Sequence, residues 1–233
     1  MAKRPVYIPS FESGLLVETT LVEFTWHPGM ASSQKKKSVA DLHKSARRNN
    51  ICRQPLEVSS KSMEDLGRRL SAFNLTVNVA NNGRSATVET AFQSSKVFQN
   101  GGPYTDLLHG TSLAAKKDER LKDSGELIGF EFLGLRWPLE PKTAFYDWLY
   151  LNSLRNNQTA IDELASFDAF TDIEFNPKKS INCQAYSVAL FKALHGRGML
   201  DYALQNKEVF LDLISEGPIN NAEENTAIQR KLI

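Results

Sequence analysis

Three polar side chains near the middle of the chain follow one another at helical spacing. Glu89, Gln93 and Lys96 occupy positions i, i+4 and i+7, so a helix over 89–98 would align them on one face. A carboxylate, an amide and an ammonium on one helix face suit a chemical site better than a core. The alternative is that Glu89 only favours the positive end of the helix dipole.

The elements that would hold these side chains are those of a helix-rich α+β domain with one small β-sheet. A hairpin around Asn81-Asn82-Gly83 comes directly before the polar helix, because apolar, β-branched runs flank this turn signal. The pattern also predicts a strand within 15–24, a helix from Ser32 or Ser33 to about 48, helical segments at 104–118, 141–156 and 158–167, a strand at 126–132, a loop at 168–179, a helix capped by Ser180 to about 194, and two short final helices.

Length and composition fit one soluble domain with an N-terminal extension. The chain has 233 residues, 41% of them hydrophobic and 24% charged, and its formal net charge is +1. We expect residues 1–55 to pack as a strand and a basic helix on a main domain at 56–216, followed by a mobile polar tail at 217–233. No apolar run is long enough for a membrane span, and no signal peptide is visible.

The cysteines and histidines indicate neither disulfides nor a metal. Cys52 and Cys183 are the two cysteines, and neither has metal-ligand spacing, which is typical of a reduced, cytoplasmic protein. His27 and His43 also lack partners at metal spacing, so no metal site is expected.

An ordered series of short motifs surrounds the polar helix. The series is Ser60-Lys61, Gly67, Leu70-Ser71-Ala72-Phe73, Asn82-Gly83-Arg84, the segment 88–98, Trp137, Ile173-Glu174-Phe175-Asn176-Pro177 and Ile181-Asn182-Cys183-Gln184. In order and spacing it resembles the NADAR (YbiA-like) family, whose members act on ADP-ribose-like N-glycosides. Two departures stand out: Thr90-Ala91 replaces a His-Tyr pair after the glutamate, and Lys178-Lys179-Ser180 replaces a Trp-Gly pair.

A narrower resemblance covers the N-terminal region and these departures. The blocks EFTWHPGM, KKKSVADLH, GGPYTDL, KTAFYDWLY and DAFTDIEFNPKKSINCQA are similar to the NADAR antitoxins encoded beside DarT-type toxins, which attach ADP-ribose to guanine bases of DNA. The resemblance implies an antitoxin of a phage-defence toxin–antitoxin system, a glycosidase that hydrolyses this N-glycosidic bond on single-stranded DNA without a cofactor. Two alternatives stay open: a non-catalytic antitoxin that binds the toxin or ADP-ribose, and a metabolic N-glycosidase on small ADP-ribose-like molecules.

The family positions imply four catalytic candidates: Glu89, Lys96, Glu174 and Lys61. Hydrolysis through an oxocarbenium-like transition state needs a carboxylate, which Glu89 or Glu174 could supply. Either lysine could hold a phosphate or, if its pKa were lowered, form a Schiff base with an opened ribose. A salt bridge with Lys178 or Lys179 would explain Glu174 without a function, and a solvated surface is the ordinary place for both lysines. We expect Glu89, Lys96 and Glu174 to converge on one pocket.

Further residues are candidates for substrate binding through stacking, hydrogen bonds or close backbone approach. Core packing, a plain turn or helix capping would explain each of them equally well. These candidates are Phe73, Gln93, Gly102, Tyr104, Asp147, Trp148 and Asn182.

The predicted helix at 32–48 carries the chain's one local excess of positive charge. Lys35, Lys36 and Arg47 are its candidates for contact with a DNA backbone, and a solvated charged face is the ordinary alternative.

Overall fold

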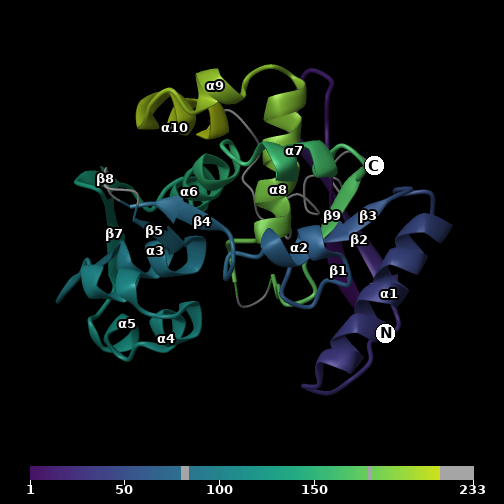
Figure 1. Ribbon diagram of the computed structural model, residues 1–233, viewed down its shortest axis with the longest axis horizontal. Coiled ribbons are helices and arrows are strands. Elements are labelled where there is room, and N and C mark those ends of the chain that lie inside the picture. The colour runs from purple at the N-terminus through teal and green to yellow at the C-terminus, as the bar shows by residue number, and fades with distance from the viewer. Residues whose placement is uncertain (80–83, 178–179, 216–233) are drawn as a thin grey trace. The chain divides into compact units, whose positions relative to one another are not determined.

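The computed structural model describes residues 1–79, 84–177 and 180–215, and it confirms the α+β class (Figure 1). The chain divides into two compact units. Unit 1 combines residues 1–71 with the chain from residue 157 onward, and unit 2 comprises residues 72–156. Residues 1–55 therefore share a unit with the C-terminal helices. The predicted tail at 217–233 lies outside the described residues.

Unit 1 is built on a sheet with strand order β2-β1-β9-β3. β1 (Ala2–Pro9) pairs antiparallel with β2 (Val17–Phe24) and with β9 (Ala169–Thr171), and β9 pairs parallel with β3 (Pro55–Glu57). The sequence pattern predicted β2 but not β1, whose two prolines argue against a paired strand. It also assigned β9 to a loop.

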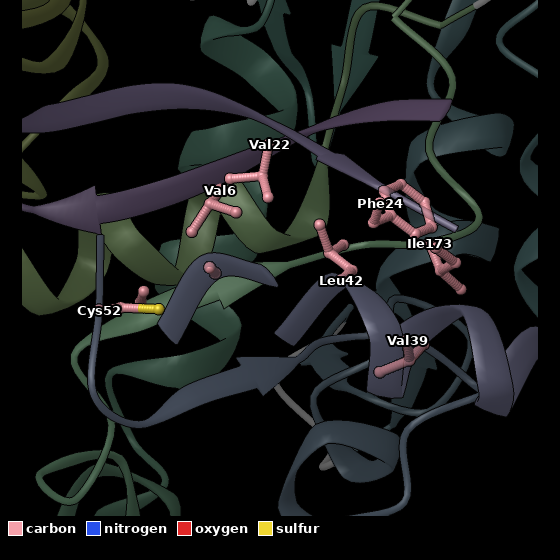
Figure 2. Close-up of a cluster of buried hydrophobic side chains, with 9 residues drawn as sticks. Val6, Val22, Phe24, Val39, Leu42, Cys52 and Ile173 are labelled. Atoms are coloured by element: carbon pink, nitrogen blue, oxygen red, sulfur yellow. The ribbon is translucent and has the colours of Figure 1, made fainter. Parts of the chain in front are cut away.

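Two helices cover opposite faces of this sheet. Val6 packs in a cluster with Val39 and Leu42 of α1 (Ser32–Arg48), as Figure 2 shows. The next residue, Tyr7, makes an edge-to-face ring contact with Tyr186 of α8 (Gln184–Gly196). Because neighbouring side chains of a strand point to opposite faces, α1 and α8 lie on opposite sides of β1.

The remaining helices of unit 1 are short. Their bounds are α2 Asp65–Arg69, α7 Gln158–Leu164, α9 Leu200–Ala203 and α10 Lys207–Ser215. Helix α8 begins later than predicted, because Cys183 and not Ser180 is its N-cap residue.

Unit 2 contains a hairpin and a separate three-stranded sheet. β4 (Thr76–Asn78) pairs antiparallel with β5 (Ser85–Thr87), which agrees with the predicted hairpin, although residues 81–83 of its turn lie outside the described part. The second sheet has the order β6-β7-β8: β6 Lys96–Phe98, β7 Leu127–Phe132 and β8 Leu135–Trp137. The sequence predicted one small sheet, whereas the described residues form three sheets, one in unit 1 and two in unit 2.

The helices of unit 2 include the polar helix, α3 (Val88–Ser94), and α6 (Ala144–Leu154), which packs against it. Phe145 of α6 stacks against Phe130, and both rings pack near Phe92 of α3. The segment predicted as helical at 104–118 is interrupted at Gly110. It forms a 3-10 helix, η1 (Thr105–His109), and α4 (Ser112–Lys117), with α5 (Arg120–Asp123) following.

The polar helix ends earlier than its spacing predicts. α3 stops at Ser94, and Lys96 opens strand β6, where it pairs with Phe130 of β7. The hydroxyls of Ser94 and Ser95 both donate to the carbonyl oxygen of Ala91. Serine side chains that bond to nearby backbone in this way favour helix ends over helix interiors.

Candidate active site

Glu89 lies in the first turn of α3 and is held there by local contacts. Thr87 caps the helix, because its side-chain oxygen accepts from the backbone N–H of Thr90. The backbone N–H of Glu89 donates to the carbonyl oxygen of Ala72, 2.9 Å away. Only 6% of Glu89 is exposed, so its carboxylate is nearly buried at the positive end of the helix.

Two side chains converge on one oxygen of this carboxylate. Gln93 Nε2 donates to Glu89 Oε1 at 2.9 Å, and Lys116 Nζ lies 3.6 Å from the same atom. Neither of these two contacts involves Glu89 Oε2. Gln93 Oε1 is also buried without a hydrogen-bond partner among the described residues. Two acceptor oxygens of this cluster are therefore available to a ligand. Buried acceptors in proteins nearly always have a hydrogen-bond donor, so we expect a ligand to supply the donor for Gln93 Oε1.

Lys96 is a partly desolvated amine beside this cluster. Its Nζ lies 5.0 Å from the centroid of the Phe92 ring. Burial lowers the pKa of Lys96, and the positive charge of Lys116 lowers it further, while the charge of Glu89 opposes the shift. A lower pKa increases the fraction of neutral amine, which is the form that can act as a nucleophile.

Lys116 is a site residue that the sequence analysis missed. It belongs to α4, its side chain is 55% exposed, and its Nζ lies 5.2 Å from the centroid of the Phe73 ring. α4 is anchored next to Phe73, because Ser112 Oγ donates to the carbonyl oxygen of that residue. The fold thus brings Phe73 and Lys116 to the polar end of α3, although no local spacing links them to Glu89.

The glycine loop after β6 packs closely on Lys96. Gly102 has a φ of 82°, and a Cβ at this position would lie 2.2 Å from the carbonyl oxygen of Lys96. A side chain would therefore displace the backbone of Lys96. The hydroxyl of Tyr104 is hydrogen-bonded to Ser124, and the guanidinium carbon of Arg120 lies 4.5 Å from the centroid of the Tyr104 ring. These contacts give Tyr104 a structural role whether or not it also binds a ligand.

The two candidates on α6 differ in burial. Asp147 is buried in the first turn of the helix, and its backbone N–H donates to the carbonyl oxygen of Thr143. Trp148 is half-buried, with its ring 4.9 Å from that of Trp137. The indole N–H groups of both tryptophans have no hydrogen-bond partner within the described residues.

The other catalytic candidates belong to unit 1. The side chain of Glu174 is 42% exposed, and its Oε1 lies 3.3 Å from Nζ of Lys35, which also sits 4.8 Å from the ring of Trp26. Lys35 is thus engaged by Glu174, whereas Lys178 and Lys179, the predicted salt-bridge partners, lie outside the described residues. Because Glu89 and Lys96 belong to unit 2, their convergence with Glu174 stays a prediction.

Lys61 and Asn182 lie in loops of unit 1. Lys61 is half-buried, and its backbone N–H donates to Ser59 Oγ at 3.1 Å. Asn182 directly precedes the N-cap residue of α8, and its Oδ1 is buried without a hydrogen-bond partner in the described part of the chain. Asn182 therefore offers an acceptor rather than a helix cap.

A buried carboxyl group that the sequence analysis did not single out lies beside these loops. Only 1% of Glu57 is exposed. Its Oε1 accepts from Ser59 Oγ at 2.6 Å and from the backbone N–H of Ile173 at 2.8 Å, and Thr171 Oγ1 lies 2.7 Å from its Oε2. His43 Nε2 lies 2.9 Å from the same threonine oxygen. Burial raises the pKa of Glu57, and the nearby charge of Asp172 raises it further.

The basic helix presents a cationic stripe to solvent. Lys36, Lys44 and Arg47 are exposed on α1, whose opposite side is buried against the sheet. Positions i, i+8 and i+11 share one helix face. Lys35 differs from the other two DNA-binding candidates, because it is partly buried and paired with Glu174.

Two classes of feature are absent from the described residues. No group of three or more His, Cys, Asp or Glu residues there could hold a metal ion. No helix in the same part of the chain is long and apolar enough to cross a membrane.

The fold and the site define an α+β protein with a nearly buried carboxylate, an amide and two amines gathered at the start of a short helix. The family described as the DarT1-associated NADAR antitoxin matches residues 2–224, and the chain belongs to this family. Membership makes a DarT-type toxin system its context. Among curated proteins, none is similar enough to count as a match.

Proposed function

We propose that this antitoxin is a hydrolase that removes ADP-ribose from guanine bases of DNA modified by a DarT-type toxin. The observation that carries the proposal is the cluster of Glu89, Gln93, Lys96 and Lys116 in a chain of this antitoxin family. A purely inhibitory antitoxin would not need a nearly buried carboxylate beside an amine of lowered pKa. An amine of perturbed pKa beside a buried carboxylate is typical of catalytic sites.

The cluster can supply the groups that cleavage of a C–N glycosidic bond requires. Glu89 Oε2 can accept a proton from water or stabilise positive charge at C1″ of the ribose, while Gln93 Oε1 can accept from a ribose hydroxyl. When the ribose ring opens, the C1″–O4″ bond breaks, O4″ takes a proton, and C1″ is left in an imine with the guanine amine. The neutral amine of Lys96 can then attack C1″ and displace the guanine amine, which leaves with the proton that Lys96 gives up. Water then hydrolyses the resulting imine, which releases ADP-ribose and restores Lys96. Lys116 can hold the pyrophosphate as a mobile point charge.

Purified protein is expected to release ADP-ribose from single-stranded DNA that carries ADP-ribosylated guanine. The reaction should proceed in EDTA, because the protein supplies the acid, base and amine groups. Chromatography of released ADP-ribose checks this. Unmodified DNA is the blank. No release, together with tight binding of the toxin, would replace this proposal by a non-catalytic antitoxin.

We also propose that the stripe on α1 follows the phosphates of the modified strand. Reversal of Lys36, Lys44 and Arg47 to Glu is expected to raise the KM for an oligonucleotide. The slope of log affinity against log salt concentration should become shallower by about 2, given roughly 0.7 per lost phosphate contact on a single strand. Turnover of free ADP-ribosyl guanosine should stay unchanged.

A matched control reverses three exposed basic residues outside α1, namely Arg53, Lys122 and Lys142. This variant has the same net charge as the α1 variant, so it separates a local contact from a general electrostatic effect. Equal losses in both variants, or an equal loss on the free nucleoside, would contradict the proposed DNA contact.

A further inference from the structure

We infer that Glu57 is a positioning residue, which joins the loop of Lys61 to the loop of Glu174 and fixes both relative to the sheet of unit 1. This inference rests on the proposed function, because the two loops carry Lys61 and Glu174, which the family positions imply for the same site. Glu57 itself is buried and makes no contact with substrate in this role. It acts through the backbone of the two loops.

The first arm of the network reaches Lys61 through Ser59. Ser59 Oγ donates to Glu57 Oε1 at 2.6 Å and accepts from the backbone N–H of Lys61 at 3.1 Å. Ser59 and Lys61 lie two and four residues after Glu57, which ends β3. The carboxyl group of Glu57 therefore sets the path by which the chain leaves the strand toward Lys61.

The second arm reaches Glu174 through Ile173. The backbone N–H of Ile173 donates to Glu57 Oε1 at 2.8 Å, while the side chain of Ile173 is buried in the hydrophobic cluster with Phe24 and Val39 (Figure 2). This hydrogen bond and the cluster thus hold the residue just before Glu174 in place. Asp172 continues the arm, since its Oδ1 accepts from the backbone N–H groups of Glu174 at 2.9 Å and Phe175 at 3.2 Å.

The pairing of the strands places Glu57 where both arms can meet. Glu57 is paired with Thr171 in the parallel register of β3 and β9, so the two strands end side by side. Thr171 Oγ1 bridges Glu57 Oε2 and His43 Nε2. The network therefore also ties both strand ends to α1, whose Lys35 pairs with Glu174.

The hydrogen bonds of Glu57 are compatible with a carboxylic acid. Its Oε1 accepts from two donors, whereas a proton on Oε2 can be donated to Thr171, which in turn can donate to a neutral His43. Burial keeps His43 neutral by lowering its pKa to about 4, and burial raises the pKa of Glu57. A glutamine at position 57 can reproduce the same pattern, because its Nε2 can donate to Thr171.

The test compares Glu57→Gln with Glu57→Ala in the full chain. The Gln variant is expected to keep kcat/KM on ADP-ribosylated DNA within about threefold, because every hydrogen bond has a counterpart. The kcat/KM of the Ala variant is expected to fall at least about tenfold, the usual scale when a residue that orients a functional group by hydrogen bonding is removed. Amide hydrogen exchange at Lys61 and Ile173 should accelerate in the Ala variant only.

Thr19→Val is the matched control. Thr19 is a buried residue of β2, two strands away from β9, and its hydroxyl has no partner within the described residues. It should change neither turnover nor exchange in the two loops. If the Ala variant fails to fold, Ser59→Ala and Thr171→Val each remove one hydrogen-bonded link of Glu57. Amide hydrogen exchange at Lys61 and Ile173 in these variants then tests the inference.

Three results would overturn the inference: full turnover in a folded Ala variant, equal losses in the Gln and Ala variants, or lost turnover with unchanged exchange at both amides. A wild-type protein without turnover would instead contradict the proposed function. In that case the exchange measurement still tests the link between the two loops.

Discussion

The Glu89→Gln variant is expected to lose about 10²–10⁴-fold in kcat, the usual scale for a positioned acid or base. Glutamine keeps the shape of the side chain and an acceptor for Gln93, but it removes the charge and the basicity of the carboxylate. The loss should be expressed mainly in kcat, because this charge acts on the positive charge that develops in the transition state. Single-turnover kinetics on ADP-ribosylated DNA would measure it.

Two variants show whether this loss belongs to Glu89 alone. Glu126→Gln changes an exposed glutamate that also accepts from a glutamine side chain, Gln99, and it should have no effect. Glu174→Gln is expected to give mainly a binding defect, because its carboxylate is 42% exposed and paired with Lys35. Full activity of Glu89→Gln, with thermal unfolding unchanged, would show that Glu89 is not the catalytic carboxylate.

Local spacing predicted the parts of the fold and the site that depend on local contacts. The i, i+4 relation predicted the pair of Glu89 and Gln93, which the structure joins by a hydrogen bond. The turn signal around residues 81–83 predicted the two strands on either side of it. In both cases the partners are close along the chain, so local spacing and turn residues are enough to predict the contact.

The parts that were missed depend on contacts between distant segments. Lys96 was placed on the helix, but pairing with Phe130 draws it into a sheet. Lys116 and Glu57 gained importance only from tertiary packing, because the former reaches Glu89 from α4 and the latter binds the N–H of Ile173. β1 was missed since its prolines are unfavourable in isolation, yet β2 and β9 enclose it.

The Lys96→Arg variant is expected to lose at least about 10²-fold in turnover, because arginine keeps the positive charge but cannot supply a neutral amine. For the wild type, kcat should rise with pH as the Lys96 amine loses its proton, and level off once deprotonation is complete. Burial lowers the pKa of Lys96, so this rise should be complete below the pH expected for an ordinary lysine. The Arg variant should lack the rise.

Reductive trapping tests the same amine without turnover. The Lys96 amine and the aldehyde carbon of opened ADP-ribose form an imine with loss of water, and cyanoborohydride delivers hydride to the imine carbon to give a stable secondary amine. Peptide mass spectrometry should locate this adduct on Lys96 and find none in Lys96→Arg. Lys192 is the internal control, since burial also lowers its pKa while its Nζ donates to the carbonyl oxygen of Leu164.

The position of the adduct distinguishes the remaining roles of the two candidate lysines. An adduct on Lys61, with Lys96→Arg fully active, would make Lys61 the nucleophile and leave Lys96 as a phosphate ligand. Full activity of Lys96→Arg with no adduct on either lysine would exclude imine catalysis at both. Glu89 would then have to activate water directly, because its free Oε2 is the acceptor that the cluster still offers.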